Sequence, residues 1–189
     1  FLGDDRARAD LAHLAALYDG EIRYTDDEFR NFFEEARKRK LIDDNTLVVV
    51  TSDHGEEFNE HGGLAHGRTL HDEVVRVPLI MKWPNRIPSG KAVDSLVQLT
   101  DIMPTLLAAA GQDIPSQCKG GDLAKLWGNP TASADAREVG LQLALEGGSA
   151  AWRSACWKAI FSSKDTTPKV YDLRADPAEL TQLKADEVV

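Results

Sequence analysis

The sequence predicts an α/β protein, in which a parallel-dominated sheet is flanked by helices and followed by a small antiparallel α+β subdomain. A long amphipathic pattern comes first, from about Arg6 to Leu41, and indicates helix. The continuous β-branched run Thr46–Thr51 follows, and such runs are typical of a central parallel strand that is buried on both faces. From about Glu138 onward, short alternating segments replace this pattern and indicate antiparallel strands.

The first helix rests on apolar residues that recur at three- and four-residue steps, namely Leu11, Leu14, Leu17, Tyr18, Ile22, Phe29, Phe32, Phe33 and Ala36. Gly20 and the polar stretch Thr25–Glu28 predict a break or a newly capped start within it.

After a turn at Asp43–Asn45, strands and helices alternate. The expected elements are strand Thr46–Thr51, a long Gly- and His-rich loop Ser52–Glu73, strands Val75–Trp83 and Val93–Leu99, helix Asp101–Ala110, which Gly111 ends, and a helical turn Asp122–Trp127. Long loops in compact domains are usually functional or disordered, so we regard the loop as the first place to look for chemistry.

The C-terminal segment is expected to hold strands Val139–Leu145, Ala150–Phe161 and Lys169–Leu173, followed by a helix from Pro177. We therefore divide the chain into residues 1–130, an α/β part, and residues 131–189, the small antiparallel sheet and helix.

The net charge of the chain restricts the kinds of molecule that it is expected to bind. Acidic residues outnumber basic ones by 31 to 22, for a net charge of -9, so binding to nucleic acid is disfavoured. The basic run Arg37–Lys40 falls at the end of the first helix, where cations complement the helix dipole. A small anionic substrate stays open, because a bound metal can reverse the local sign. No apolar run is long enough to predict a membrane span.

Cys118 and Cys156 are far apart and match no metal or redox spacing. They either pair in an exported protein or remain buried thiols. The chain opens with Phe1, so we expect a processed chain or a part of a longer one. Any export signal would then lie upstream, and the compartment stays open.

Asp53 and His54 stand directly after the strand Thr46–Thr51, where open parallel sheets place their ligands. Carboxylate and imidazole both bind divalent ions, and Gly55 allows the tight turn that follows. A lone Asp in this position is more often a cap or turn residue. One Asp and four His within about twenty residues favour a metal site, since His61, His66 and His71 follow in the same loop.

The stretch Thr51–Glu57, with His61-Gly62 and His66–Leu70, resembles the C-terminal portion of the sulfatase family, which belongs to the alkaline phosphatase superfamily. Further matches follow the family's order along nearly the whole chain, at Tyr18–Ile22, Asp26-Asp27, Asp44–Val48, Arg76–Ile80, Asp101–Leu107, Gly111, Trp157-Lys158 and Val170–Pro177. The resemblance implies a partial alkaline-phosphatase-like fold and the hydrolysis of a small sulfate ester.

The same resemblance implies that Asp53 and His54 bind a divalent ion, usually calcium in this family. A Lys or His in the next loop contacts the sulfate group and helps the leaving oxygen depart. His66 is the nearest candidate for that role, and Arg68 could supply the positive charge instead. A hydrogen-bonding role within the loop is as well supported for His66, and His61 and His71 are expected to be structural.

The family's nucleophile is a formylglycine made from Cys or Ser in a Cys/Ser-x-Pro-x-Arg motif, and neither Cys118 nor Cys156 lies in one. The resemblance thus implies a longer parent that supplies the nucleophile and two more metal-binding aspartates. We expect the isolated chain to be inert and, because it would expose a sheet edge, to self-associate.

Two other functions stay open. Phosphoester or phosphonate-ester hydrolysis in the same superfamily would use the same Asp-His pair. A non-catalytic module could keep the fold and bind a metal or a partner. A dinuclear zinc hydrolase is disfavoured, because the chain has no H-E-x-x-H spacing.

Overall fold

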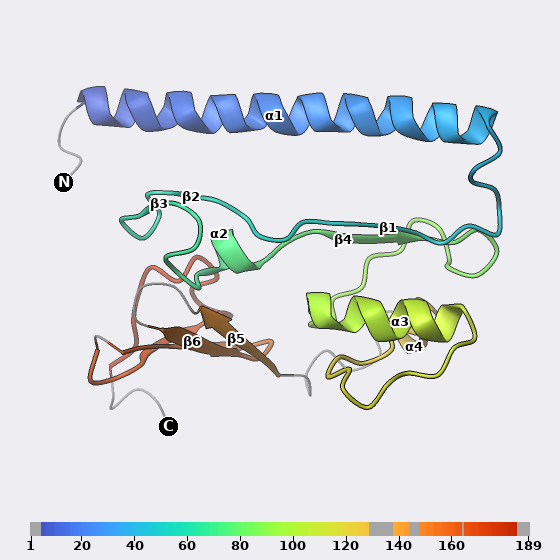
Figure 1. Ribbon diagram of the computed structural model, residues 1–189. Coiled ribbons are helices and arrows are strands. Elements are labelled where there is room, and N and C mark those ends of the chain that lie inside the picture. Colours follow the sequence, from blue (N-terminus) through green and yellow to red (C-terminus); the bar gives the residue numbers. More distant parts are fainter. Residues whose placement is uncertain (1–4, 129–137, 144–147, 164, 185–189) are drawn as a thin grey trace.

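The computed structural model of the protein describes residues 5–128, 138–143, 148–163 and 165–184. Its helices are α1 (Asp5–Lys38), α2 (Asp72–Val75), α3 (Ile102–Ala109) and α4 (Ala124–Trp127), with a 3-10 turn, η1 (Leu99–Asp101), before α3. Its strands are β1 (Val48–Thr51), β2 (Glu57–Phe58), β3 (Leu64–Ala65), β4 (Leu79–Lys82), β5 (Val139–Leu143), β6 (Ser149–Arg153), β7 (Trp157–Ser162) and β8 (Lys169–Asp172). In Figure 1, α1 runs along one side of β1 and β4, and α3 lies on the other side.

Helix α1 is continuous, so the predicted break near Gly20 is wrong. A single glycine in an exposed helix costs only about 1 kcal/mol, and ion pairs across the next turns offset it. Arg23 binds Asp27 at 3.1 Å, and Arg30 binds Asp26 at 3.2 Å and Asp27 at 2.8 Å. The polar stretch therefore continues the helix instead of capping a new one. None of the described helices, α1 included, is both long and apolar enough to cross a membrane.

The sheet that holds β1 is antiparallel, which corrects the predicted parallel-dominated sheet. Val48 lies opposite Lys82, and Thr51 lies opposite Leu79. Every strand pair in the described residues is antiparallel. The apolar β-branched run indicated burial, but burial does not determine the direction of a neighbouring strand. Here the chain leaves β1, turns back through the loop and returns alongside as β4.

The predicted strand Val93–Leu99 does not form. These residues run without a described strand into η1 and α3, because the Asp101 side chain caps the turn. The Asp101 carboxylate is fully buried and accepts hydrogen bonds from the amides of Gln98 at 2.8 Å and Gly121 at 2.7 Å. A buried carboxylate that is satisfied by backbone amides outweighs a moderate strand propensity.

The C-terminal strands form one antiparallel sheet in the order β5-β6-β7-β8, as the alternating pattern predicts. The predicted strand Ala150–Phe161 is two strands, β6 and β7, joined by a turn that contains Cys156. Cys118 and Cys156 are both free thiols. The expected helix from Pro177 is absent from described residues 177–184, where the chain turns instead. The proposed boundary at residues 130 and 131 lies outside the described residues.

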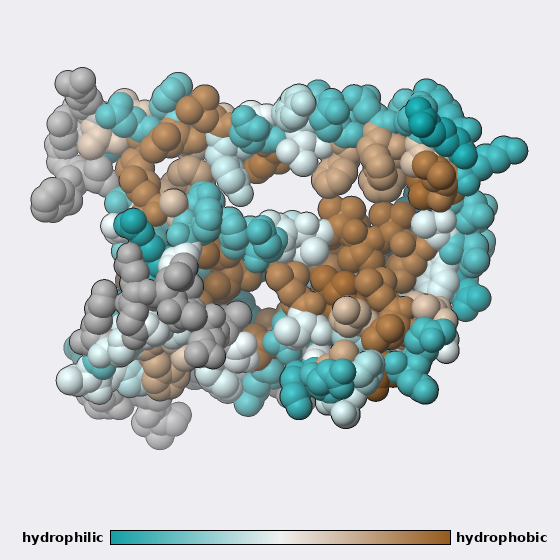
Figure 2. Space-filling model, viewed as in Figure 1, coloured by the Kyte–Doolittle hydropathy of each residue, from teal (hydrophilic) through white to brown (hydrophobic). Residues whose placement is uncertain are grey.

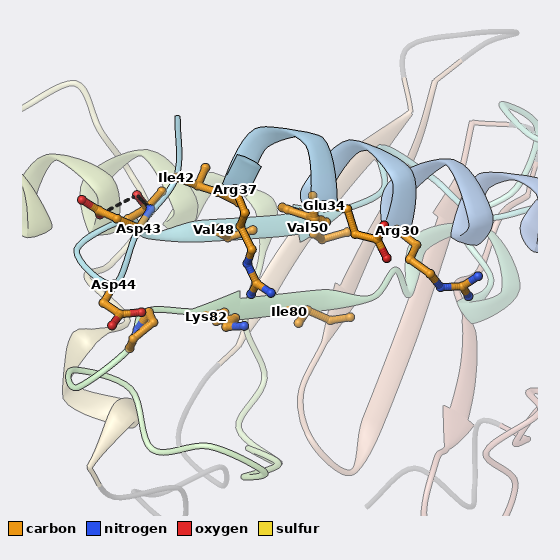
Figure 3. Close-up of a pocket in the computed structure, with 13 residues that line it drawn as sticks. Arg30, Glu34, Arg37, Ile42, Asp43, Asp44, Val48, Val50, Ile80 and Lys82 are labelled. Carbon is orange, nitrogen blue, oxygen red and sulfur yellow. Dashed lines mark hydrogen bonds between the residues drawn. The ribbon is translucent and has the colours of Figure 1, made fainter. Parts of the chain in front are cut away.

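Apolar side chains gather around β1 and β4, with openings between this region and α1 (Figure 2). Ile80 on β4 is 60% exposed, and Phe32 on α1 is 62% exposed. A cavity of about 710 Å³ separates the last turns of α1 from the sheet (Figure 3). Its floor is apolar, with Val48, Val50 and Ile80, and charged side chains line its rim. This half of the molecule leaves an unusual amount of apolar surface uncovered.

The C-terminal sheet is held to the α/β part by four side chains, which we call the ion cluster: Asp72, Arg153, Lys158 and Glu179. The fully buried Lys158 ammonium lies 2.8 Å from Asp72 and 2.7 Å from Glu179, and Arg153 lies 3.0 Å from Asp72. Burial by itself would raise the pKa of Asp72, but its hydrogen bond to Arg153 and the nearby Lys158 charge lower it to about 2.

Replacing Lys158 by Met should lower the free energy of unfolding by about 3–5 kcal/mol, because it leaves buried carboxylates without their cation. Urea unfolding at neutral pH measures this. The same substitution at the exposed Lys119 is the matched control and should cost little. The stabilisation from Asp72 is complete above its ordinary pKa of 3.8 and is lost as the pH falls through about 2. The cost of Lys158→Met should therefore shrink over that interval, and an equal cost in both variants would contradict the assignment.

Candidate functional site

The end of β1 delivers Asp53 and His54 to the surface. The Ser52 hydroxyl donates to the His54 carbonyl at 2.7 Å, and the Thr51 hydroxyl donates to the Pro78 carbonyl beside β4 at 2.8 Å. These bonds fix the turn that follows the strand. The Asp53 side chain is 86% exposed and the His54 side chain 39% exposed. Both groups are thus free to take a ligand.

The Asp53 carboxylate and the His54 ring form a pair of electron donors. The His54 amide donates to Asp53 Oδ1 at 3.0 Å, and this bond, with the amide of Asp53 itself, holds the pKa of the Asp53 carboxyl below its usual value. His54 Nδ1 lies 2.9 Å from the Gly55 carbonyl and must donate to it, so in the neutral ring Nε2 carries the lone pair. That nitrogen lies 3.7 Å from Asp53 Oδ2.

A cation fits between these two donors. Ligand atoms about 2.0–2.6 Å from one divalent ion are roughly 3–3.7 Å apart when they meet it near a right angle. The 3.7 Å between Asp53 Oδ2 and His54 Nε2 lies at the upper end of that range. Two protein ligands leave most of such an ion's shell to other donors.

The β2–β3 hairpin brings His66 to the pair. In this hairpin Glu57 lies opposite Ala65, and His66 follows directly. The His66 ring stacks on the His54 ring with centroids 3.7 Å apart, and its Nδ1 lies 3.3 Å from Glu56. The structure thus brings together Asp53, His54 and His66, three of the four residues singled out from the sequence.

These three side chains line one cavity of about 520 Å³. Arg76 and Arg153 line it as well, and Arg153 comes from β6 in the C-terminal sheet. Arg68, the fourth residue singled out, is exposed and does not line this cavity. Sequence reasoning missed Arg76 and Arg153, because nothing local marks an arginine in a strand or loop as part of a site. The cavity therefore combines a carboxylate–imidazole pair with two arginines, of which Arg153 is paired with Asp72, another lining residue.

Gly55 is required by close approach. Its amide donates to the Val74 carbonyl at 2.7 Å, and a Cβ at this position would lie 2.1 Å from the Glu73 carbonyl oxygen. The residue after the Asp-His pair is thereby packed directly against α2. Only a residue without a side chain fits there.

His61 and His71 lie apart from this cavity and face the ion cluster. His71 Nδ1 lies 2.6 Å from Glu179, and His61 Nδ1 lies 2.7 Å from Glu73. His71 is buried and His61 is half-buried, and the structural role expected of both stays a prediction.

Comparison with known proteins adds the family. The sulfatase family model matches residues 3–112. Arylsulfatase K of Mus musculus is 30% identical over 188 residues, which cover 94% of this chain and 34% of that protein. A solved structure in complex with its substrate D-glucosamine-2-N,6-O-disulfate has a TM-score of 0.78 and 27% identity, with 88% of this chain and 36% of that chain covered. The phosphonate monoester hydrolase of Agrobacterium radiobacter has a TM-score of 0.80 and 27% identity, with 94% and 38% covered.

The likeness to these solved structures shows that the chain is an α/β protein of the alkaline-phosphatase-like fold, with a carboxylate and an imidazole at the end of a strand. The chain belongs to the sulfatase family and corresponds to its C-terminal portion. It spans about a third of the length of the relatives that it matches.

Replacing Gly55 by Ala should lower the free energy of unfolding by about 1–3 kcal/mol, because the new methyl group overlaps the Glu73 carbonyl. Gly20→Ala is the matched control, since a Cβ there meets no atom within 4 Å. It should stabilise α1 by about 1 kcal/mol. Urea unfolding of both variants makes the comparison, and a stable Gly55→Ala chain would show that the loop does not pack as described.

Proposed function

We propose that this chain supplies the metal-binding and leaving-group side of a site that hydrolyses sulfate esters. The observation that carries the proposal is the convergence of Asp53, His54 and His66 in one cavity that Arg76 and Arg153 also line. Asp53 and His54 hold a divalent ion, for which calcium is the first candidate from the family resemblance. When bound, the ion polarises a sulfuryl oxygen.

In the proposal, His66 acts on the leaving group. Its ring stacks on the His54 ring, both residues line the same cavity, and its side chain is 47% exposed. An imidazolium there can contact a sulfuryl oxygen and give its proton to the departing alkoxide or phenoxide. Arg68 is the weaker candidate for the supporting charge, because Arg76 and Arg153 line the cavity and Arg68 does not.

The given sequence contains no Cys/Ser-x-Pro-x-Arg motif, so the proposal takes the nucleophile from outside it. In the proposal it is a formylglycine on additional sulfatase polypeptide, which also completes the metal shell. The uncovered apolar surface around β1 and β4 suits the docking of that polypeptide. The chain alone is then inert, and the same surface promotes its self-association.

Phosphonate monoester hydrolysis is the second candidate. The likeness to the Agrobacterium radiobacter hydrolase favours it, since that comparison covers 94% of the chain. Sulfate and phosphonate esters place similar charged oxygens at the metal, so substrates must be compared directly.

The isolated chain should bind calcium no more tightly than about 10⁻³ M, since Asp53 and His54 provide only two ligands. Isothermal titration measures this. Asp53→Asn should abolish the heat of binding, whereas Asp165→Asn, on the exposed turn before β8, should leave it unchanged. Binding that survives in Asp53→Asn would place the ion elsewhere.

Activity is best tested in a chimera, in which this chain replaces the matching segment of the relative whose structure contains glucosamine disulfate. The chimera should hydrolyse an aryl sulfate. Asp53→Asn should lower kcat by at least about 100-fold, because the charge on the sulfuryl oxygens loses its stabilisation. His66→Gln should lower kcat by about 10²–10⁴-fold, with the larger loss for poorer leaving groups.

Asp165→Asn is again the matched control in the chimera and should keep full activity. Faster turnover of an aryl monoester of phenylphosphonate than of the aryl sulfate would favour the second candidate. A folded chimera that binds calcium but turns over neither ester would leave a non-catalytic module as the function of the chain.

A further inference from the structure

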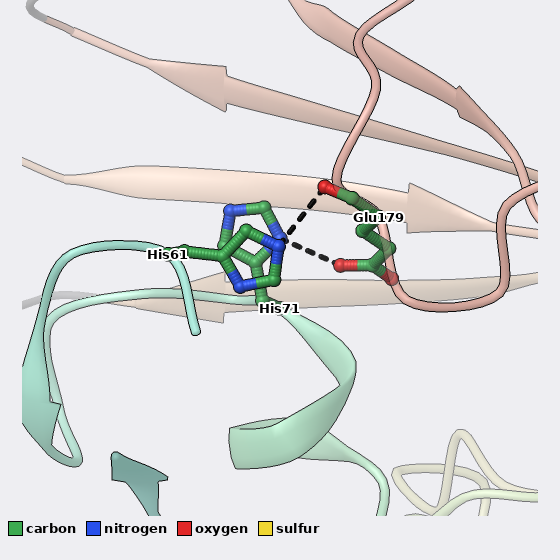
Figure 4. A group of neighbouring side chains, drawn as sticks. All are labelled: His61, His71 and Glu179. Atoms are coloured by element: carbon green, nitrogen blue, oxygen red, sulfur yellow. Dashed lines mark hydrogen bonds and ion pairs between the residues drawn. The ribbon is translucent and has the colours of Figure 1, made fainter. Parts of the chain in front are cut away.

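His61 occupies a position in which both of its ring nitrogens face hydrogen-bond acceptors. Nδ1 lies 2.7 Å from a carboxylate oxygen of Glu73, and Nε2 lies 2.9 Å from the backbone carbonyl of Glu179 (Figure 4 shows the second bond). A neutral imidazole has one N–H and one lone pair, so it would turn a lone pair toward one of these acceptors. Only the imidazolium cation, with an N–H at both nitrogens, satisfies both contacts.

The surroundings of His61 carry an excess of negative charge. The charged and titratable groups that face it, directly or through Glu179, are Glu57 of β2, His71 and Asp72 at the start of α2, Glu73 of α2, Arg153 of β6, Lys158 of β7, Tyr171 of β8 and Glu179 of the C-terminal segment. Four are carboxylates and two are permanent cations. A proton on His61 offsets part of that imbalance inside a site with little water.

A metal ion shared by His61 and His71 is a poor alternative to a proton on His61. Donor atoms of His61, His71 and Glu179 lie within 4.8 Å of one another, which by distance alone would permit one. However, the His61 and His71 rings are stacked, with centroids 3.6 Å apart and planes within 2° of parallel. An imidazole lone pair lies in the plane of its ring, and no point lies in both of two stacked planes. An ion could therefore meet at most one ring in good geometry.

His61 also lies where it can hold the β2–β3 hairpin that positions His66. It follows β2 at the tip of the hairpin, and its own amide donates to Glu57 at 3.0 Å. One ring nitrogen holds this tip to α2, and the other holds it to the C-terminal segment. The second strand of the same hairpin ends at Ala65, directly before His66, which stacks on His54. Loss of either bond at the tip frees the hairpin that places His66.

We propose that His61 is held as an imidazolium cation and is a positioning residue, which fixes the β2–β3 hairpin to α2 and to the C-terminal segment and so keeps His66 beside His54. The part that concerns His66 rests on the proposed function, whereas the charge on His61 does not.

The shift in the pKa of His61 has the direction that a protonated ring requires. Burial by itself would lower the pKa of His61, but the hydrogen bond to Glu73, the carbonyl of Glu179 and the charges of both carboxylates outweigh it and raise the pKa. The stabilisation from protonated His61 is therefore complete below the pKa that His61 has in the unfolded chain. It is lost as the pH rises through the higher pKa that His61 has in the folded chain. The hairpin should loosen on the alkaline side.

The test is a pH titration of the 189-residue chain, labelled with ¹⁵N in its histidine rings and followed by NMR. Both ring nitrogens of His61 should be protonated at neutral pH, and His61 should titrate at a higher pH than the histidines of the urea-unfolded chain. Glu73→Gln should shift this titration to lower pH, because it removes the charge and keeps the shape. His13→Gln, on the exposed surface of α1, removes the signal of a histidine that no described hydrogen bond links to the cluster, and it is the control for folding.

A second readout concerns the site. The nuclear Overhauser contact between the His54 and His66 rings should weaken as the pH rises through the His61 transition, and it should be weak at every pH in His61→Gln. A His61 with one unprotonated nitrogen at neutral pH would overturn the proposal, as would a ring contact that persists through the transition. If His61→Gln does not fold, the pH titrations of the parent chain and of Glu73→Gln still test whether His61 is an imidazolium. Since no readout is catalytic, failure of the sulfatase proposal would leave this result intact.

Discussion

The structure depends on one buried ammonium group. Lys158 is fully buried on β7 and is paired with Asp72 at the start of α2 and with Glu179 in the C-terminal segment. A charge without water is tolerated only when partners surround it, so these three elements cannot move apart independently. The C-terminal sheet thereby forms part of the wall of the cavity. Arg153, which extends the same cluster through Asp72, lines the cavity that contains Asp53.

The two sides of the molecule differ in how well their side chains are covered or paired. Around the ion cluster, buried polar groups meet partners at hydrogen-bonding distance. Around β1 and β4, apolar side chains such as Ile80 remain exposed, and a cavity separates α1 from the sheet. An apolar surface of this kind is costly in water unless another surface covers it. The chain also spans about a third of the length of its relatives. Both facts accord with the proposal that further sulfatase polypeptide completes the site.

Part of the fold follows from local pattern. Apolar periodicity places helix at α1 and α3 and strands in the C-terminal sheet, although it predicts one strand where β6 and β7 form. The pattern fails where a single side chain overrides propensity. Ion pairs carry α1 past Gly20, and the buried Asp101 carboxylate turns the expected strand at residues 93–99 into a capped helix start. Strand direction fails for another reason, since a buried strand has the same composition beside a parallel or an antiparallel neighbour.

The sequence by itself determined the family and the residues at the strand end, because Asp53, His54 and Gly55 are contiguous and their chemistry depends on that order. Only the tertiary structure decided which other groups join them. Lys158 meets Asp72 across 86 positions of sequence, and no local signal encodes such a contact. The charge state of His61 is decided in the same way, because both of its acceptors become neighbours only after the chain has folded. The sequence gives the chemistry of each side chain, whereas folding decides which groups lie next to it.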